Sequence, residues 1–84
     1  MNRMEIRVHF YSYFKDLTGC AVTTQAVTEG TTLDSLVKEV LRQLPKLAPM
    51  ERSMLVAVGV DYQGRDYILK AGDEVSMFPP VQGG

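Results

Sequence analysis

A change of hydrophobic period in the middle of the chain is the feature that most constrains its fold. Apolar residues recur at positions 33, 36, 37, 40, 41 and 44, a spacing that places them on one stripe of an α-helix. Pro45 cannot continue such a helix, so the helix should end near Leu44. Thr31 and Asp34 resemble a capping box at its start, with Asp in place of the usual Glu. One apolar stripe needs one apolar sheet face to cover it.

On both sides of this helix the hydrophobic period is two, which predicts β-strands. Glu5–Tyr11 alternates, with Ile6, Val8 and Phe10 on one face. Further strands are expected at residues 20–27, 54–60, 66–69 and 74–78. Between them, residues 14–19 and 46–52 should be irregular connections and residues 62–65 a turn.

The expected order of elements is therefore ββαβββ. We predict a single α+β domain over residues 1–84, with a mixed sheet of about five strands packed on one amphipathic helix. The compact solution for this order is the β-grasp, or ubiquitin-like, arrangement. In that fold the first and last strands are central and parallel neighbours. The last predicted strand leads into Pro79 and Pro80, which cannot donate ladder hydrogen bonds, and residues 79–84 are expected to form a flexible C-terminal tail.

Composition excludes several classes of partner. Nine basic and ten acidic residues give a formal net charge of -1, which argues against a nucleic-acid-binding surface. No apolar run is long enough to span a bilayer, and the N-terminal residues carry no signal-peptide core, so we expect a cytoplasmic protein. The single Cys20 cannot form an internal disulfide or supply a multi-cysteine metal site. No metal site is expected.

The distinctive chemistry lies in the last two residues, Gly83 and Gly84. Glycine has no side chain to shield the backbone, so this pair can enter a narrow slot in another protein. An α-carboxylate on Gly84 would present an unhindered carbonyl, but a carboxylate reacts only after it acquires a good leaving group. Adenylation by ATP supplies such a group. The stiff Pro79–Pro80 segment would limit the entropy lost when the tail is ordered.

The residues before the glycines identify the resemblance. The pattern Gly72-Asp73-Glu74-Val75, then Phe78-Pro79-Pro80-Val81, then Gly83-Gly84 resembles the small-subunit family of molybdopterin synthase, within the ubiquitin-like sulfur-carrier group. Weaker support comes from the segments 8–11 and 14–19. Gln82 stands where that family commonly has a small residue.

The resemblance implies a cycle in which the chain carries sulfur. An E1-like activating enzyme would use ATP to adenylate Gly84, and sulfur transfer would convert the adenylate to a thiocarboxylate. This chain would form a hetero-oligomer with the large synthase subunit, a heterotetramer in that family. The large subunit would pass the sulfur to cyclic pyranopterin monophosphate. Gly83 and Gly84 would be the reacting residues. The chain itself would supply no general acid or base and bind no cofactor.

The alternation also predicts a partner surface. If Ile6, Val8 and Phe10 face the helix, then Tyr11 faces away from it, and Phe78 does so by the same rule. Large aromatics on an outer sheet face suit a protein–protein contact. We expect Tyr11, Tyr62 and Phe78, with Pro79, Pro80 and Val81 of the tail, to bind the partner.

Other readings of the same residues remain open at this point. The chain could carry sulfur for thiamine thiazole synthesis or for tungsten-cofactor synthesis. It could also be a ubiquitin-like modifier of lysines, or a β-grasp binding module whose glycines have no chemical role. His9 and Cys20 are interpreted as a surface or interface residue and a small strand residue, because neither has an activating neighbour in sequence.

Overall fold

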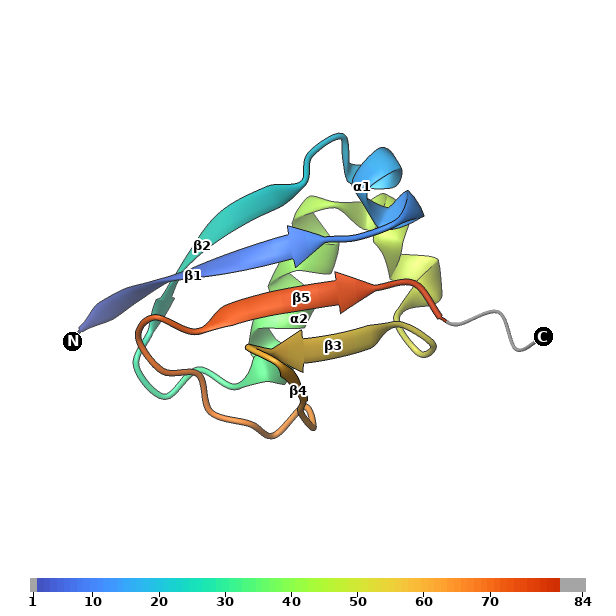
Figure 1. The fold of residues 1–84 in the computed structure, drawn as a ribbon. Helices are drawn as coiled ribbons and strands as arrows, with labels where there is room; N and C mark the ends of the chain where they lie inside the picture. The colour runs from blue at the N-terminus through green and yellow to red at the C-terminus, as the bar shows by residue number, and fades with distance from the viewer. Residues whose placement is uncertain (1, 81–84) are drawn as a thin grey trace.

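The segment predicted as the first strand is an inner strand of a five-stranded mixed sheet, beside the central strand (Figure 1). The computed structural model describes residues 2–80. In sheet order, the strands are β2 (Val22–Thr28), β1 (Arg3–Phe10), β5 (Glu74–Phe78), β3 (Leu55–Val58) and β4 (Asp61–Tyr62). The strands β1 and β5 pair in parallel, and the other neighbours pair antiparallel. The predicted β-grasp arrangement is confirmed, including its central parallel pair.

Helix α2 (Leu33–Gln43) crosses one face of this sheet and forms the core with it (Figure 1). Five of the six residues of its predicted stripe are buried, Leu44 at the C-cap is partly buried, and the alternating residues of β1 and β5 meet the stripe. The core side chains from these three elements are Met4, Ile6, Val8, Phe10, Leu33, Leu36, Val37, Val40, Leu41, Val75 and Met77. Each buried side chain of this kind contributes about 1.5–3 kcal/mol, so their burial is what holds the helix on the sheet.

The helix begins as predicted, but a different residue caps it. Thr32, and not Thr31, is the N-cap, and its hydroxyl accepts a hydrogen bond from the Ser35 N–H at 3.2 Å. The Asp34 carboxylate does not complete a capping box. It pairs with Arg65, which the sequence pattern gave no reason to place nearby. The end of the helix before Pro45 is as predicted.

Two segments expected to be irregular are helical. The connection after β1 contains the short helix α1 (Tyr13–Thr18), and the linker after α2 forms the 3-10 helix η1 (Pro45–Met50). Each is fixed by a buried side chain, Phe14 in α1 and Leu47 in η1, both 0% exposed. Helices of about six residues depend on such tertiary packing, and their period is too short to read from sequence. Within residues 2–80 no helix is long and apolar enough to cross a membrane.

The fourth strand is not where the sequence predicted it. Residues 66–69 form no strand, and β4 is instead the two-residue segment that follows the turn at Gly59. Gly59 has φ 62°, a value that favours glycine, and it ends β3 two residues before the predicted limit. Tyr62, expected in a turn, therefore pairs with Ala57 in a ladder.

The segment 64–69 forms hydrogen bonds with the start of α2 and adds no strand to the sheet. The carbonyl oxygens of Tyr67 and Arg65 accept hydrogen bonds from the N–H groups of Leu33 and Asp34, at 2.7 and 2.9 Å. These donors belong to the first turn of α2 and have no partner within the helix. The loop therefore satisfies the start of the helix through backbone groups, and no side-chain pattern encodes that role.

Candidate functional site

Three aromatic side chains, which we call the aromatic row, lie on the sheet face opposite α2. The rings of Tyr11 and Phe78 stack, with centroids 4.9 Å apart and planes inclined by 12°. Tyr62 meets Phe78 edge to face at 6.4 Å and 70°. Both geometries are favourable for aromatic pairs. Tyr11 is 43% exposed and Tyr62 68%, whereas Phe78 between them is half-buried.

Strand register explains why residues so far apart in sequence meet here. Phe10 pairs with Met77 across the central parallel strands, so the next residue of each strand, Tyr11 and Phe78, turns to the outer face. The N–H of Tyr11 continues this pairing by donating to the Met77 carbonyl at 3.2 Å. Tyr62 reaches the same face from β4. The structure thus brings together the three aromatics that the sequence placed there, and their binding of a partner stays a prediction.

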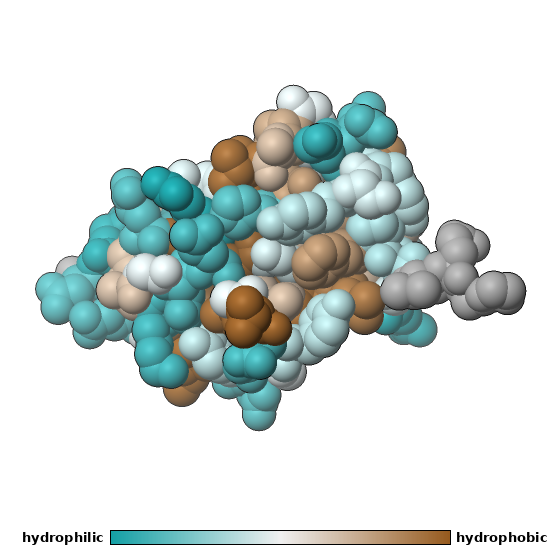
Figure 2. Space-filling view, viewed as in Figure 1, coloured by the Kyte–Doolittle hydropathy of each residue, from teal (hydrophilic) through white to brown (hydrophobic). Residues whose placement is uncertain are grey.

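A groove with a volume of ≈ 430 Å³ lies beside the aromatic row. Its lining residues are Ser12, Tyr13, Leu55, Tyr62, Phe78, Pro79 and Pro80. Figure 2 views this face of the sheet, where mostly hydrophilic side chains cover the N-terminal end of β1 and paler, more apolar ones gather over the C-terminal ends of β1 and β5. The predicted tail residues Pro79 and Pro80 therefore form part of a surface that begins with the aromatic row.

Sequence reasoning missed three residues of this groove, Ser12, Tyr13 and Leu55. Ser12 has φ 57° and ψ -140°, a conformation that is rare outside glycine. This single residue turns the chain from β1 into α1 and leaves an exposed tyrosine on each side of itself. Leu55 could have been found from the outward phase of its strand, because it pairs with Phe78. Nothing in the sequence signals the backbone angle of Ser12.

A hydrogen-bonded pair of polar side chains borders the aromatic row on its β1 side. His9 Nε2 lies 2.7 Å from Glu74 Oε1 across the parallel strands, and the His9 ring stacks loosely on Tyr11 at 6.3 Å. The imidazole is therefore engaged by a carboxylate beside an apolar surface. This position agrees with the interpretation of His9 as a surface or interface residue.

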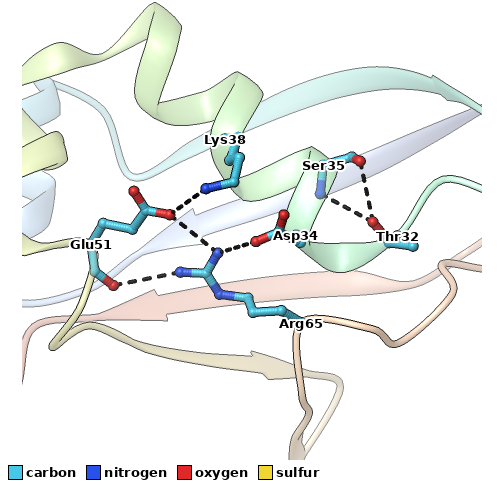
Figure 3. A network of polar contacts seen from close by, with 6 residues as sticks. All are labelled: Thr32, Asp34, Ser35, Lys38, Glu51 and Arg65. Atoms are coloured by element: carbon cyan, nitrogen blue, oxygen red, sulfur yellow. Dashed lines mark hydrogen bonds and ion pairs between the residues drawn. The ribbon is translucent and has the colours of Figure 1, made fainter.

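A second polar cluster fastens the loop before β5 to the helix (Figure 3). Arg65 Nη1 donates to Asp34 Oδ1 at 2.8 Å and approaches Glu51 Oε2 at 3.4 Å, and Lys38 Nζ donates to the same Glu51 oxygen at 3.1 Å. The hydrogen bond from Lys38, with the charge of Arg65, lowers the pKa of Glu51 below its ordinary value. The cluster joins α2, the end of η1 and the loop, so its role is structural.

The part of the chain that the structure describes was also a possible location for a metal cluster or an activated cysteine. Within residues 2–80 no three His, Cys, Asp or Glu side chains lie close enough to hold a metal ion. Cys20 is partly buried, and its Sγ lies 3.7 Å from the Thr18 hydroxyl, which is not a base that would activate a thiol. Three predicted site residues, Val81, Gly83 and Gly84, lie outside the described residues.

The fold and this outer-face site together define a class of protein. The protein is a ubiquitin-like β-grasp protein. Its mixed sheet has parallel first and last strands, one helix covers the sheet, and an apolar surface lies at the end of the last strand. The chain belongs to the ThiS family, whose model matches residues 8–84.

Curated relatives support this membership across nearly the whole chain. The molybdopterin synthase sulfur carrier subunit of Escherichia coli is 32% identical over 94% of this chain and 99% of its own length. The protein of the same name from Arabidopsis thaliana is 26% identical over 96% of this chain and 84% of its own length. The resemblance predicted from the C-terminal motif is confirmed.

Solved structures share the fold. A putative molybdopterin converting factor subunit 1 from Pyrococcus furiosus superposes with a TM-score of 0.84 at 26% identity, covering 93% of this chain and 99% of that one. The modifier SAMP1 from Haloferax volcanii gives 0.82 at 19% identity, over 95% of this chain and 99% of its own. At that identity the second likeness shows the fold alone.

Proposed function

We propose that this chain is the sulfur carrier of a molybdopterin synthase, with the Gly84 carboxylate as the group that carries sulfur. That carboxylate would attack the α-phosphate of ATP in the active site of an E1-like enzyme, and pyrophosphate would leave. A sulfur nucleophile would then displace AMP from the acyl-adenylate and leave a thiocarboxylate on Gly84. The large subunit of the synthase would use this sulfur to build the dithiolene on cyclic pyranopterin monophosphate, in two rounds.

The observation that carries the proposal is the continuity between the aromatic row, the groove and the tail. Phe78 belongs to the row, and Pro79 and Pro80 line the groove immediately before the segment that leads to Gly83 and Gly84. A partner bound on this surface would receive the tail without a search through solution, because the tail begins at the interface. The names of the curated relatives support the same activity.

In this proposal the described residues bind and position, and they perform no proton transfer. The aromatic row would provide the central anchor, since aromatic residues dominate the energetics of protein interfaces. The groove would take an apolar side chain or the backbone of the large subunit. In the structure of the complex of subunits 1 and 2 of the molybdopterin-converting factor from Helicobacter pylori, one chain shares this fold, with a TM-score of 0.65 at 22% identity.

Intact mass spectrometry tests the covalent part of the proposal. The chain is co-expressed with an E1-like activating enzyme, purified and weighed, beside a matched variant that lacks Gly84. The native chain should gain the mass difference between sulfur and oxygen, and the truncated chain should not. The mass before activation also checks that Gly84 is the last residue. A chain that never gains the thiocarboxylate, although the enzyme and ATP are active, would refute the carrier role.

A pull-down separates the proposed pathway from the thiamine alternative. The tagged chain is offered the large synthase subunit and a thiazole synthase in equal amounts. We expect the large subunit to be retained and the thiazole synthase to be lost in the wash. The reverse result would keep the sulfur chemistry and replace the pathway.

A further inference from the structure

Strand β2 lies at one edge of the sheet, with β1 on one side and no neighbouring strand on the other (Figure 1). The hydrogen bonds to β1 determine which backbone groups of β2 point outward. The Phe10 N–H donates to the Ala21 carbonyl at one end of the pairing, and the Glu29 N–H donates to the Asn2 carbonyl at the other. Antiparallel pairs alternate between bonded and non-bonded residues. The inward-bonded residues of β2 are therefore 23, 25 and 27.

The N–H and C=O groups of the alternate residues Val22, Thr24 and Ala26 consequently face outward. No hydrogen bond within residues 2–80 uses them, whereas the carbonyl of Thr28 is taken by the turn that follows. All three side chains are exposed, and that of Val22 is 44% exposed. The edge thus offers three consecutive bonding positions.

This edge lacks the features that keep strand edges unpaired. Proteins protect edges with charges, proline, bulges or very short strands. The opposite edge of this sheet follows the rule, since β4 has only two residues. By contrast, β2 has seven residues, and no charged residue or proline occurs from Cys20 to Thr28. Its register with β1 runs through seven consecutive pairs without a bulge.

The edge is also complementary to itself. With a two-fold axis at Thr24, antiparallel pairing of two copies sets Val22 opposite Ala26 and Thr24 opposite its own counterpart. An apolar side chain then meets an apolar one, a hydroxyl meets a hydroxyl, and no like charges are opposed along the strand. Three bonded pairs would exchange about six backbone hydrogen bonds.

We propose that β2 is a pairing edge for a second copy of this chain, joining two five-stranded sheets into one continuous sheet. The axis stands perpendicular to the sheet, so both α2 helices would lie on one face and both aromatic rows on the other. Because β1 separates β2 from β5, the groove and the tail would remain accessible in the pair. The contact is small, which makes the association weak and dependent on concentration.

Amide hydrogen exchange of the native chain, followed by NMR at increasing concentration, tests this proposal without a mutation. At low concentration the amides of Val22, Thr24 and Ala26 should exchange rapidly, while those of Thr23 and Gln25 are protected by β1. Between about 10 µM and about 1 mM, the range expected for a small interface, the first three should become protected. Sedimentation velocity over the same range should show a growing average mass.

A proline at the central position provides the matched variant. Thr24→Pro removes one outward N–H and no inward bond, so the fold should persist while association is lost. The control Thr24→Val keeps that N–H and should associate like the native chain. A monomer throughout the range would overturn the proposal. Association that survives Thr24→Pro but disappears in Phe78→Asp would also overturn the proposal, because the contact would then use the aromatic row. Protection of the β2 amides that arises only when another protein is added would overturn it as well.

Discussion

Replacing Phe78 by Asp should separate binding from folding at the centre of the aromatic row. The ring touches Tyr11 on one side and Tyr62 on the other, so its removal dismantles both aromatic pairs at once. The backbone ladder of β5 does not depend on this side chain, because its inward residues Val75 and Met77 form the core contacts. The substitution therefore acts mainly on the outer face.

The magnitude follows from the geometry. Complete removal of a buried phenylalanine costs about 3–5 kcal/mol, and an aromatic pair contributes about 0.5–1.5 kcal/mol. Phe78 is only half-buried, so we expect a loss of stability of about 1–2 kcal/mol, which a small domain with about 5 kcal/mol or more survives. A central aromatic anchor contributes at least about 2 kcal/mol to binding, so the affinity for the large synthase subunit should fall by roughly 30-fold or more.

Titration calorimetry with the large subunit measures the affinity, and urea unfolding measures the stability of the same variant. Ile68→Asp is the matched control, since it introduces the same charge at a 56% exposed apolar residue on the loop before β5, where it bridges to Thr32. The control should bind like the native chain. Unchanged affinity for Phe78→Asp, with the fold intact, would refute the role of the aromatic row.

Three further predictions concern stability. Ser12→Gly should raise the free energy of unfolding by about 1 kcal/mol, because glycine adopts this backbone conformation without strain, and a lower free energy of unfolding would contradict the strain. Leu36→Ala, at a side chain 1% exposed, should lower the free energy of unfolding by about 2–5 kcal/mol, and a loss below about 1 kcal/mol would remove Leu36 from the core. The pKa of Glu51 is lowered by Lys38 and Arg65, so its pairing stabilises fully above its ordinary value of 4.5 and is lost as pH falls through its lower folded value. When urea unfolding is measured from neutral pH down to about pH 3, the free energy of unfolding should fall less for Glu51→Gln than for the native chain. An equal fall for both would refute the contribution of Glu51.

Much of the fold could be predicted because its long elements obey one period each. The stripe of α2 runs over three turns and the alternation of β1 over seven residues, so both patterns are unambiguous. The parallel placement of β1 beside β5 came from the family fold, and the pairing of Phe10 with Met77 bears it out. The short elements α1, η1 and β4 were not predicted, because single tertiary contacts or one glycine turn fix them. Such contacts produce no hydrophobic periodicity in the sequence.

The site could be predicted in part for the same reason. Alternation alone placed Tyr11 and Phe78 on the outer face, and the structure shows how closely they stack. The groove could not be predicted from alternation, because it depends on the backbone angle of Ser12 and on the position of Leu55 in another strand. Arg65 likewise joins Asp34 only through the path of a loop. Contacts between distant segments of irregular backbone carry no local signature.

The central claim, that the chain delivers sulfur from Gly84 to a pterin, is tested most directly by reconstitution with purified parts. The chain is prepared once with a Gly84 carboxylate and once with a thiocarboxylate, and each is mixed with the large synthase subunit and cyclic pyranopterin monophosphate. We predict molybdopterin only from the thiocarboxylate form, with two chains consumed for each product molecule, one for each dithiolene sulfur. Product from the carboxylate form or from a chain lacking Gly84, or no product from the thiocarboxylate form, would contradict the claim.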